Sequence, residues 1–148
     1  MPKVISTNHT SFTVSDLDQS LAFFRDVLGF DVTSKAPRSP DLIQKITNVD
    51  DAEVMIAYVR GPGHSVELIE FINPENRETF RPRACDLGFY HIAYDVEGLD
   101  QLIHDAGHYG VLPEGKIVTI DQGPNAGARI VYLRDRDGIT FELIEKTR

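Results

Sequence analysis

The tetrapeptide Glu-Leu-Ile-Glu occurs twice in this chain, at residues 67–70 and 142–145, a separation of 75 positions. Each copy ends a run rich in β-branched and aromatic residues. The segment NHTSFTV at residues 8–14 also matches YHIAYDV at residues 90–96, after a shift of 82 positions. This self-similarity constrains the fold more than composition does, because it indicates two copies of one supersecondary unit.

The two copies span residues 4–71 and 86–146, and the second is seven residues shorter between its matched ends. Residues 72–85 contain two prolines and no periodicity, so we predict that they link the two modules. A chain of 148 residues has the size of one ordinary domain. We therefore expect residues 1–148 to form a single domain made of two modules.

Each copy has the pattern of a strand, a helix and then further strands. In the first copy the helix is expected within residues 15–29, with Ser15 as its N-cap and Gly29 at its end. In the second copy a thinner apolar stripe from Leu99 to Ala106 marks a shorter helix. The Pro-rich stretch at residues 34–41 is expected to be a loop.

The later strands of each copy are indicated by β-rich runs on either side of a glycine-bearing turn, at residues 53–71 and 128–145. Weaker strands are expected near residues 29–34 and 116–120. Each module then has the order β-α-β-β-β. The predicted fold class is α+β.

The charge balance argues against two classes of partner. The chain has 15 basic and 23 acidic residues and a net charge of −8, so a nucleic acid or an anionic membrane is not expected to bind it. The single cysteine, Cys85, cannot form an intrachain disulfide and favours a reducing compartment. No apolar run reaches the roughly 18 residues of a membrane span, and the N-terminus has no apolar signal core. We expect a cytoplasmic protein.

Strand alternation places one histidine and one glutamate of each module on the same face of its sheet. Side chains two residues apart share a face, and the apolar rows must cover the helix. The opposite face then carries His9 and Glu67 in the first module, and His91 and Glu142 in the second. Two imidazoles and two carboxylates converging on one concave surface have the composition of a metal site, because buried carboxylates need a cation.

The remaining histidines fit simpler interpretations. His104 and His108 are four residues apart on a predicted helix, and the thin apolar stripe with Gly107 favours reading them as surface residues. His64 falls in a turn and Cys85 in the linker, and both are interpreted as structural or incidental.

The repeated pattern resembles the vicinal oxygen chelate superfamily, which includes glyoxalase I, extradiol dioxygenases, and fosfomycin and bleomycin resistance proteins. The resemblance is carried by residues 8–30, 66–71, 88–102 and 133–145, and it covers nearly all of residues 7–146. It implies two βαβββ modules that form a cupped, eight-stranded mixed sheet around a divalent metal.

The resemblance also implies the roles of the four shared-face residues. His9, Glu67, His91 and Glu142 would be the metal ligands, a set similar to that of bacterial-type glyoxalase I. The cation would be Ni, Co, Zn, Mn or Fe, because imidazoles suit these metals better than Ca. Glu142 would be the catalytic base and Glu67 its symmetric partner. The implied activity is that of a lyase or isomerase that transfers a proton next to a carbonyl through a metal-stabilised enolate.

Two other functions stay open. An Fe(II) extradiol-type ring-cleaving dioxygenase would use His9, His91 and Glu142, but Glu67 would then take a position that oxygen needs. A non-catalytic protein that binds a small molecule or drug is the second alternative, although bleomycin-binding members of the superfamily lack the four ligands.

Substrate contacts and assembly are less constrained. Three arginines of the linker could bind an acidic substrate tail: Arg77, Arg81 and Arg83. Other residues could contact a substrate at the rim of the cup: Arg38, Arg129, Tyr58 and Tyr132. A homodimer is expected, because modules of this superfamily pair within or between chains and exposed edge strands favour pairing.

Overall fold

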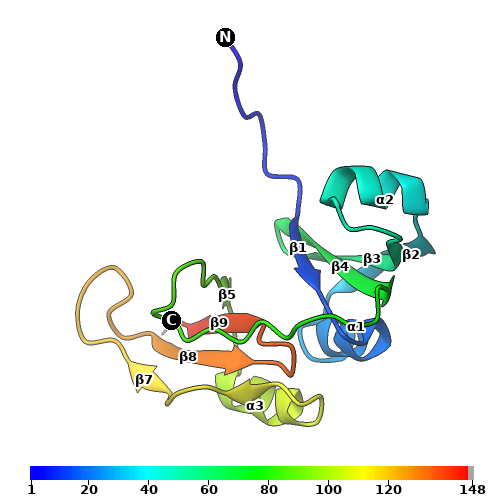
Figure 1. Ribbon diagram of the computed structural model, residues 1–148. Coiled ribbons are helices and arrows are strands. Elements are labelled where there is room, and N and C mark those ends of the chain that lie inside the picture. Colours follow the sequence, from blue (N-terminus) through cyan, green and yellow to red (C-terminus); the bar gives the residue numbers. More distant parts are fainter. Residues whose placement is uncertain (147–148) are drawn as a thin grey trace. The chain divides into compact units, whose positions relative to one another are not determined.

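The structure is a computed structural model that describes residues 1–146, and it has the α+β fold predicted from the sequence (Figure 1). The chain divides into two compact units, Met1–Arg77 and Glu78–Arg148. We refer to them as unit 1 and unit 2. Each contains one mixed sheet in which the first and last strands of the unit lie parallel.

Unit 1 contains a four-stranded sheet in the order β1-β4-β3-β2. Its elements, in chain order, are β1 (Thr10–Thr13), α1 (Leu17–Asp26), β2 (Asp31–Pro37), α2 (Pro40–Thr47), β3 (Glu53–Gly61) and β4 (His64–Asn73). Strands β2, β3 and β4 are antiparallel neighbours, whereas β1 pairs with β4 in parallel. This parallel pairing follows from the α1–β3 excursion between them, which is long enough for a crossover.

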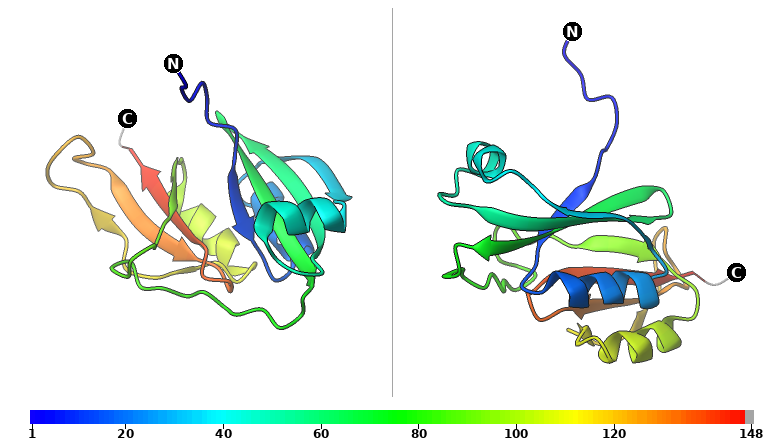
Figure 2. Two further views of the ribbon diagram at one scale, coloured as in Figure 1. Left: turned by 45° about the horizontal axis from the view of Figure 1, so that its top comes forward. Right: turned by 90° about the vertical axis from the view of Figure 1, so that its right-hand side faces the viewer.

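The two helices of unit 1 cover opposite faces of this sheet (Figure 2). Helix α1 packs over the face that carries Val66 and Leu68, both fully buried, as the alternation predicts. Helix α2 packs through Ile43 onto the other face, where it meets a cluster that includes Ile56 and Ile69. That second face also carries Glu67, because Glu67 and Ile69 are two residues apart on β4.

Two details of unit 1 differ from the sequence-based prediction. The N-cap of α1 is Asp16, whose carboxylate accepts from the Gln19 N–H at 2.9 Å, rather than Ser15. The stretch expected to be a loop, residues 34–41, instead contains the end of β2 and the start of α2. Ser39 caps it and Pro40 takes its first turn, so the proline begins the helix instead of preventing one.

Unit 2 contains a five-stranded sheet in which β5, β9, β8 and β6 are neighbours in that order and β7 also pairs with β8. Its elements are β5 (Ile92–Asp95), α3 (Leu99–Gly107), β6 (Leu112–Pro113), β7 (Val118–Thr119), β8 (Arg129–Arg134) and β9 (Thr140–Glu145). The strand expected near residues 116–120 is present as the short β7, and the short β6 precedes it at residues 112–113. Pro113 lacks an N–H and Gly115 favours a turn, so one continuous edge strand does not form.

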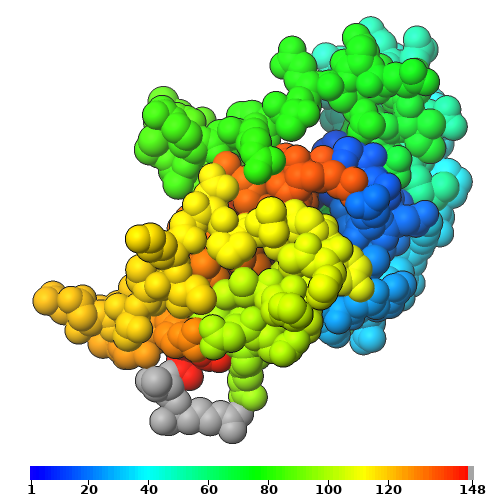
Figure 3. Space-filling view, turned by 90° about the horizontal axis from the view of Figure 1, so that it is seen from below, coloured from blue at the N-terminus to red at the C-terminus, as the bar shows by residue number. Residues whose placement is uncertain are grey.

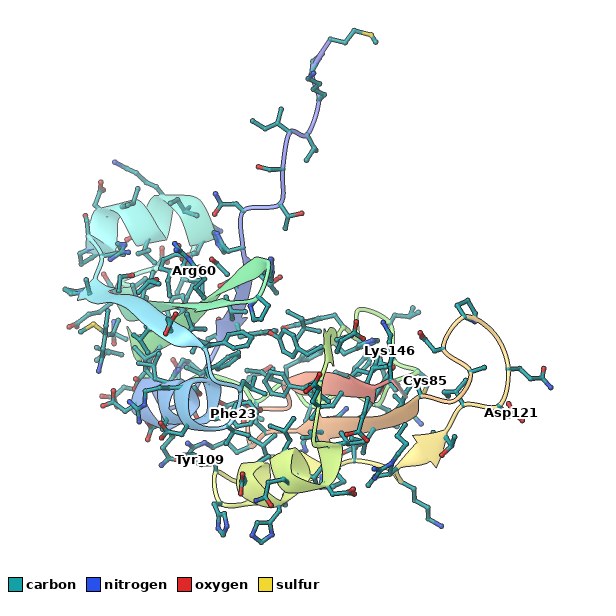
Figure 4. The ribbon with its side chains drawn as sticks, turned by 180° about the vertical axis from the view of Figure 1, so that it is seen from behind. Phe23, Arg60, Cys85, Tyr109, Asp121 and Lys146 are labelled. Carbon is teal, nitrogen blue, oxygen red and sulfur yellow. The ribbon has the colours of Figure 1, made fainter. Side chains whose placement is uncertain are left out.

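The segment that begins unit 2 contains no helix or strand between residue 78 and β5. It is held to the turn between β8 and β9, because the Arg81 guanidinium donates to the carbonyl oxygens of Asp135 and Arg136. The approach is close: a Cβ added to Gly138 would lie 2.5 Å from the Phe80 carbonyl oxygen. Cys85 lies in the same segment as an exposed free thiol (Figure 4).

The helices of residues 1–146 are too short or too polar to cross a lipid bilayer.

The second glutamate of each Glu-Leu-Ile-Glu copy binds the start of a helix. Glu70 accepts a hydrogen bond from the Leu17 N–H of α1 at 3.0 Å. Glu145 accepts from the Gly98 and Leu99 N–H groups of α3, both at 2.9 Å. Gly98, the N-cap of α3, has no side chain to satisfy these donors, so the strand supplies the acceptor. The carboxylate also lies at the positive end of the helix dipole.

Replacing Glu145 by alanine should therefore destabilise unit 2. We expect Glu145→Ala to lower the free energy of unfolding by about 1–2 kcal/mol, because two backbone N–H groups lose their acceptor. Urea denaturation followed by circular dichroism measures this. The control is Lys146→Ala at the next position, which removes only an exposed ion pair to Asp95 and should change stability by less than about 0.5 kcal/mol. Equal stabilities of the two variants would contradict the capping role.

The turn between β8 and β9 contains a carboxyl group in a desolvated position. Asp135 accepts hydrogen bonds from the N–H groups of Asp137 and Ile139, each at 2.9 Å. Desolvation by burial raises the pKa of Asp135 from its ordinary value of 3.8 to about 6, although these N–H donors favour the charged form. The stability contribution of this group is thus fully present below about pH 4 and is lost as the pH rises to about 6.

Asp135→Asn should stabilise the protein at neutral pH. The side-chain carbonyl still accepts from both N–H groups, while the buried charge is gone. We expect the free energy of unfolding to rise on the order of 1–3 kcal/mol at pH 7.5 and to change little at pH 4. Denaturant melts at the two pH values measure the difference. Asp121→Asn, in an exposed loop (Figure 4), serves as the control, and a gain from Asp135→Asn of equal size at both pH values would refute this explanation.

Candidate functional site

Three neighbouring strands of unit 1 place a row of polar side chains around Glu67. Ser11 of β1 lies opposite Glu67 in the parallel pair, and Tyr58 of β3 lies opposite Glu67 in the antiparallel pair. Directly paired residues point to the same face of a sheet. His9, two residues before Ser11, shares this face. The register of β1, β4 and β3 therefore brings four polar side chains together.

The contacts within this cluster centre on the Glu67 carboxylate. Ser11 Oγ donates to Glu67 Oε1 at 2.9 Å, and the Tyr58 hydroxyl donates to Oε2. His9 Nε2 lies 3.6 Å from Oε1, and the His9 ring meets the Tyr58 ring edge-on at 5.4 Å between centroids. On its other side, His9 Nδ1 lies 2.6 Å from Asn8 Oδ1.

Unit 2 repeats the arrangement with one substitution. Ala93 of β5 lies opposite Glu142 of β9 in the parallel pair, and Tyr132 of β8 lies opposite Glu142 in the antiparallel pair. His91 comes two residues before Ala93, as His9 comes two residues before Ser11. Alanine in place of serine is the difference between the two rows.

The contacts of Glu142 are accordingly fewer. His91 Nε2 lies 3.0 Å from Glu142 Oε2, and the His91 ring packs against the Tyr132 ring at 4.9 Å between centroids. Among the described residues of unit 2, His91 is the side chain that lies within hydrogen-bonding distance of the Glu142 carboxylate. We call the His9–Glu67 pair and the His91–Glu142 pair the two half-sites.

Both half-sites are reachable from solvent while their carboxylates are largely covered. The side chains of His9 and His91 are 30% and 32% exposed, whereas those of Glu67 and Glu142 are 13% and 19% exposed. Carboxylates covered to this degree are usually paired or bound to a cation.

The donor atoms of each half-site suit a divalent metal. Two ligands that each lie roughly 2.0–2.2 Å from one cation are about 3 Å apart. The imidazole-to-carboxylate separations of 3.6 and 3.0 Å are close to this value. A metal-binding histidine commonly donates its other ring N–H to an oxygen acceptor. Asn8 Oδ1 lies in that position beside His9 Nδ1.

The two tyrosines stay protonated beside these carboxylates. The hydrogen bond to Glu67, together with burial, raises the pKa of Tyr58. Burial, followed by the charge of Glu142, raises the pKa of Tyr132. Each phenol thus keeps its proton and is not a base, and Tyr58 donates that proton in its hydrogen bond to Glu67.

The three linker arginines all have partners within the protein. Arg77 lies 3.5 Å from the Val14 carbonyl oxygen, Arg81 binds the β8–β9 turn, and Arg83 forms an ion pair with Asp86 at 2.7 Å. Among the expected rim residues, Arg129 instead joins Asp100 of α3 to Glu145. His64 lies 2.8 Å from the Thr10 hydroxyl, in agreement with a structural role.

The half-sites also contain residues that the sequence did not distinguish. Ser11 and Asn8 were not recognised as site residues, and Tyr58 and Tyr132 had no stronger claim than other rim residues. Ser11 shares the His9 face by alternation alone, so that pattern could have identified it. The tyrosines depend on hairpin register, which turn length sets and which the pattern of residues did not determine.

Comparison with known proteins places the chain in a family. Residues 6–143 match the model of the Glyoxalase/Bleomycin resistance protein/Dioxygenase superfamily. The chain is 35% identical over 153 residues to a 2-epi-5-epi-valiolone epimerase from Actinomyces sp, a match that covers 97% of this chain and 81% of that protein. It is 25% identical over 142 residues to lactoylglutathione lyase GLX1 from Arabidopsis thaliana, where it covers 93% of this chain and 43% of that protein.

The fold agrees with this similarity. The crystal structure of the glyoxalase family protein APC24694 from Bacillus cereus superposes with a TM-score of 0.84 and 25% identity, over 99% of this chain and 97% of that chain. The match to the family model extends over both repeats and includes both half-sites. The chain therefore belongs to the Glyoxalase/Bleomycin resistance protein/Dioxygenase superfamily.

Proposed function

We propose that this protein is a divalent-metal-dependent isomerase, of the epimerase type, that transfers a proton at a carbon next to a carbonyl. The observation that carries this proposal is the pair of half-sites, each with an imidazole nitrogen close to a largely covered carboxylate oxygen. The similarity to an epimerase over 97% of the chain favours isomerisation among the activities of the superfamily.

The metal ligands in this proposal are His9, Glu67, His91 and Glu142. Their chemistry, two neutral imidazoles and two carboxylates, suits Ni, Co, Zn, Mn or Fe. A bound cation of this kind supplies a Lewis acid for the negative charge that develops on a substrate carbonyl oxygen. The proposal is the same whether the two half-sites that serve one cation belong to one chain or to two.

The contacts of the two carboxylates assign them different tasks. Glu67 is held by two hydroxyl donors, one on each oxygen, so it is suited to remain in place as a ligand. Glu142 has Ala93 opposite it in place of a serine, and it makes fewer hydrogen bonds than Glu67. A carboxylate held by fewer hydrogen-bond donors moves more easily to and from a substrate carbon. We therefore assign proton removal and return to Glu142.

Epimerisation requires that a proton leave a carbon and return to it with inverted configuration. In deuterated water, the substrate or product should then gain deuterium at that carbon. The ketone 2-epi-5-epi-valiolone is the first substrate to test, because the similar Actinomyces protein is an epimerase of that name. Methylglyoxal–glutathione hemithioacetal and a catechol panel test the lyase and dioxygenase alternatives.

Glu142→Gln should reduce deuterium incorporation at least ~100-fold, because the carboxamide cannot accept the proton. Proton NMR of the turnover mixture measures the exchange. Glu145→Gln is the matched control in the same tetrapeptide: its carbonyl can still accept from α3, and its exchange rate should stay within about twofold of wild type.

The alternative functions give distinct results in the same experiment. Oxygen consumption with a catechol would identify a dioxygenase, and D-lactoylglutathione formed from the hemithioacetal would identify a lyase. A binding protein without catalysis would retain its ligand after Glu142→Gln and show no exchange in the wild type. Any of these outcomes would contradict the isomerase proposal.

Exchanging the residues that distinguish the half-sites tests the division of tasks. Ser11→Ala removes a donor from Glu67 and should weaken metal binding by about 10-fold or more, because it disorders a ligand. Ala93→Ser adds a donor beside Glu142 and should lower kcat more than metal affinity, because the added hydrogen bond holds the carboxylate in place. Titration of the metal-free protein with the cation, and steady-state kinetics, measure the two effects. Unchanged metal affinity in Ser11→Ala together with unchanged kcat in Ala93→Ser would remove the basis for distinct roles.

Three further expectations belong to this proposal. We propose a homodimer, which light scattering at micromolar concentration tests.

For a substrate with an acidic tail, Arg83 is the first of the linker arginines to test, ahead of Arg77 and Arg81, because its exposed guanidinium could exchange Asp86 for a substrate carboxylate. We also propose that residues 1–148 act as one functional domain with residues 72–85 as the link between its modules.

A further inference from the structure

A second group of possible metal ligands lies outside the two half-sites, at the end of α3. His104, Asp105 and His108 each offer one ligand atom, and these atoms all lie within 4.8 Å of one another. The two imidazole rings approach to 5.1 Å between centroids at an interplanar angle of 89°. The group is compact because the end of α3 keeps these three side chains close together.

The backbone fixes the two histidines on one side of α3. Residues four apart lie one above the other on a helix. His108, the C-cap, keeps helical geometry, and its N–H donates to the Asp105 carbonyl oxygen at 3.1 Å. Leu99 and Ala106 face the core and are fully buried, so the histidines point outward. Figure 3 looks onto the surface of α3, which is drawn in yellow-green.

The surroundings favour a cation at this place. Asp105 is oriented by Gln101, whose side-chain amide donates to Asp105 Oδ1 at 2.8 Å. The group lies at the C-terminus of α3, where the helix dipole and the last carbonyl groups favour positive charge. Both histidines are exposed, so their rings can rotate by the short distance that brings two ligand atoms to about 3 Å.

We propose that His104 and His108 form a chelating site for a borderline divalent cation such as Zn²⁺, Ni²⁺ or Cu²⁺, with Asp105 as the third ligand. Two imidazoles and one carboxylate prefer these ions to Mg²⁺ or Ca²⁺. Three protein ligands leave the fourth position of a tetrahedral Zn²⁺ open to water or to another molecule. This site is separate from the two half-sites and does not depend on the proposed function.

The test is calorimetric titration of the metal-free, full-length protein with Zn²⁺. Relative to wild type, His104→Gln/His108→Gln should bind one Zn²⁺ fewer per chain. Each single variant, His104→Gln or His108→Gln, should weaken binding at this site by at least about 10-fold, since even loss of an outer partner of a ligand costs that much. Because both side chains are exposed, the metal-free variants should melt at the wild-type temperature.

Two matched variants separate this site from the candidate active site. His9→Gln/His91→Gln should retain the Zn²⁺ equivalent that His104→Gln/His108→Gln loses. His64→Gln removes a histidine that lies in neither group, and this variant should bind as many Zn²⁺ ions per chain as the wild type. If the wild type binds Zn²⁺ only at α3, the α3 site stands and Zn²⁺ is excluded as the active-site metal. Zn²⁺ binding of unchanged number and affinity in His104→Gln/His108→Gln would overturn the proposal.

Discussion

The parallel pairing of the first and last strands determines where the chemistry of each unit lies. In unit 1 it sets Ser11 beside Glu67, and in unit 2 it sets Ala93 beside Glu142. The histidine two residues earlier then reaches the same carboxylate from the strand end. A shift of one residue in this register would turn each glutamate toward the helix and separate it from its histidine. The half-sites therefore depend on backbone hydrogen bonds before they depend on any side chain.

The repeated Glu-Leu-Ile-Glu sequence serves two tasks on opposite faces of a strand. Its first glutamate enters a half-site, its second binds the N-terminus of a helix, and the leucine between them is buried in the core. The helix that follows the histidine strand is thus anchored to the strand that carries the glutamate. These hydrogen bonds help to hold the strand that carries the histidine in register with the strand that carries the glutamate. Both tasks fall on four consecutive residues of one strand, which explains why this tetrapeptide is repeated when much of the remaining sequence differs.

Much of this arrangement follows from the sequence, and the parts that do not have identifiable causes. Alternation correctly predicts that Val66 and Leu68 are buried while Glu67 faces away from α1, because a half-buried strand admits only one such pattern. Helix α2 was missed because Pro40 was read as a breaker, although proline is well suited to a first helical turn. Tyr58 and Tyr132 were predicted only as possible rim contacts. Their positions opposite Glu67 and Glu142 depend on register and turn length, which local patterns do not encode.

Helix α2 has a consequence for stereochemistry. A duplicated scaffold tends toward twofold symmetry, and a symmetric surface treats the two ends of a bound molecule alike. In unit 1, α2 packs through Ile43 on the face that carries Glu67, and the described residues of unit 2 contain no helix in the corresponding place. Among the described residues, the surroundings of Glu67 therefore differ from those of Glu142. The substrate of the proposed isomerase would meet different neighbours at the two half-sites, which is what a protein needs in order to distinguish the two ends of a molecule.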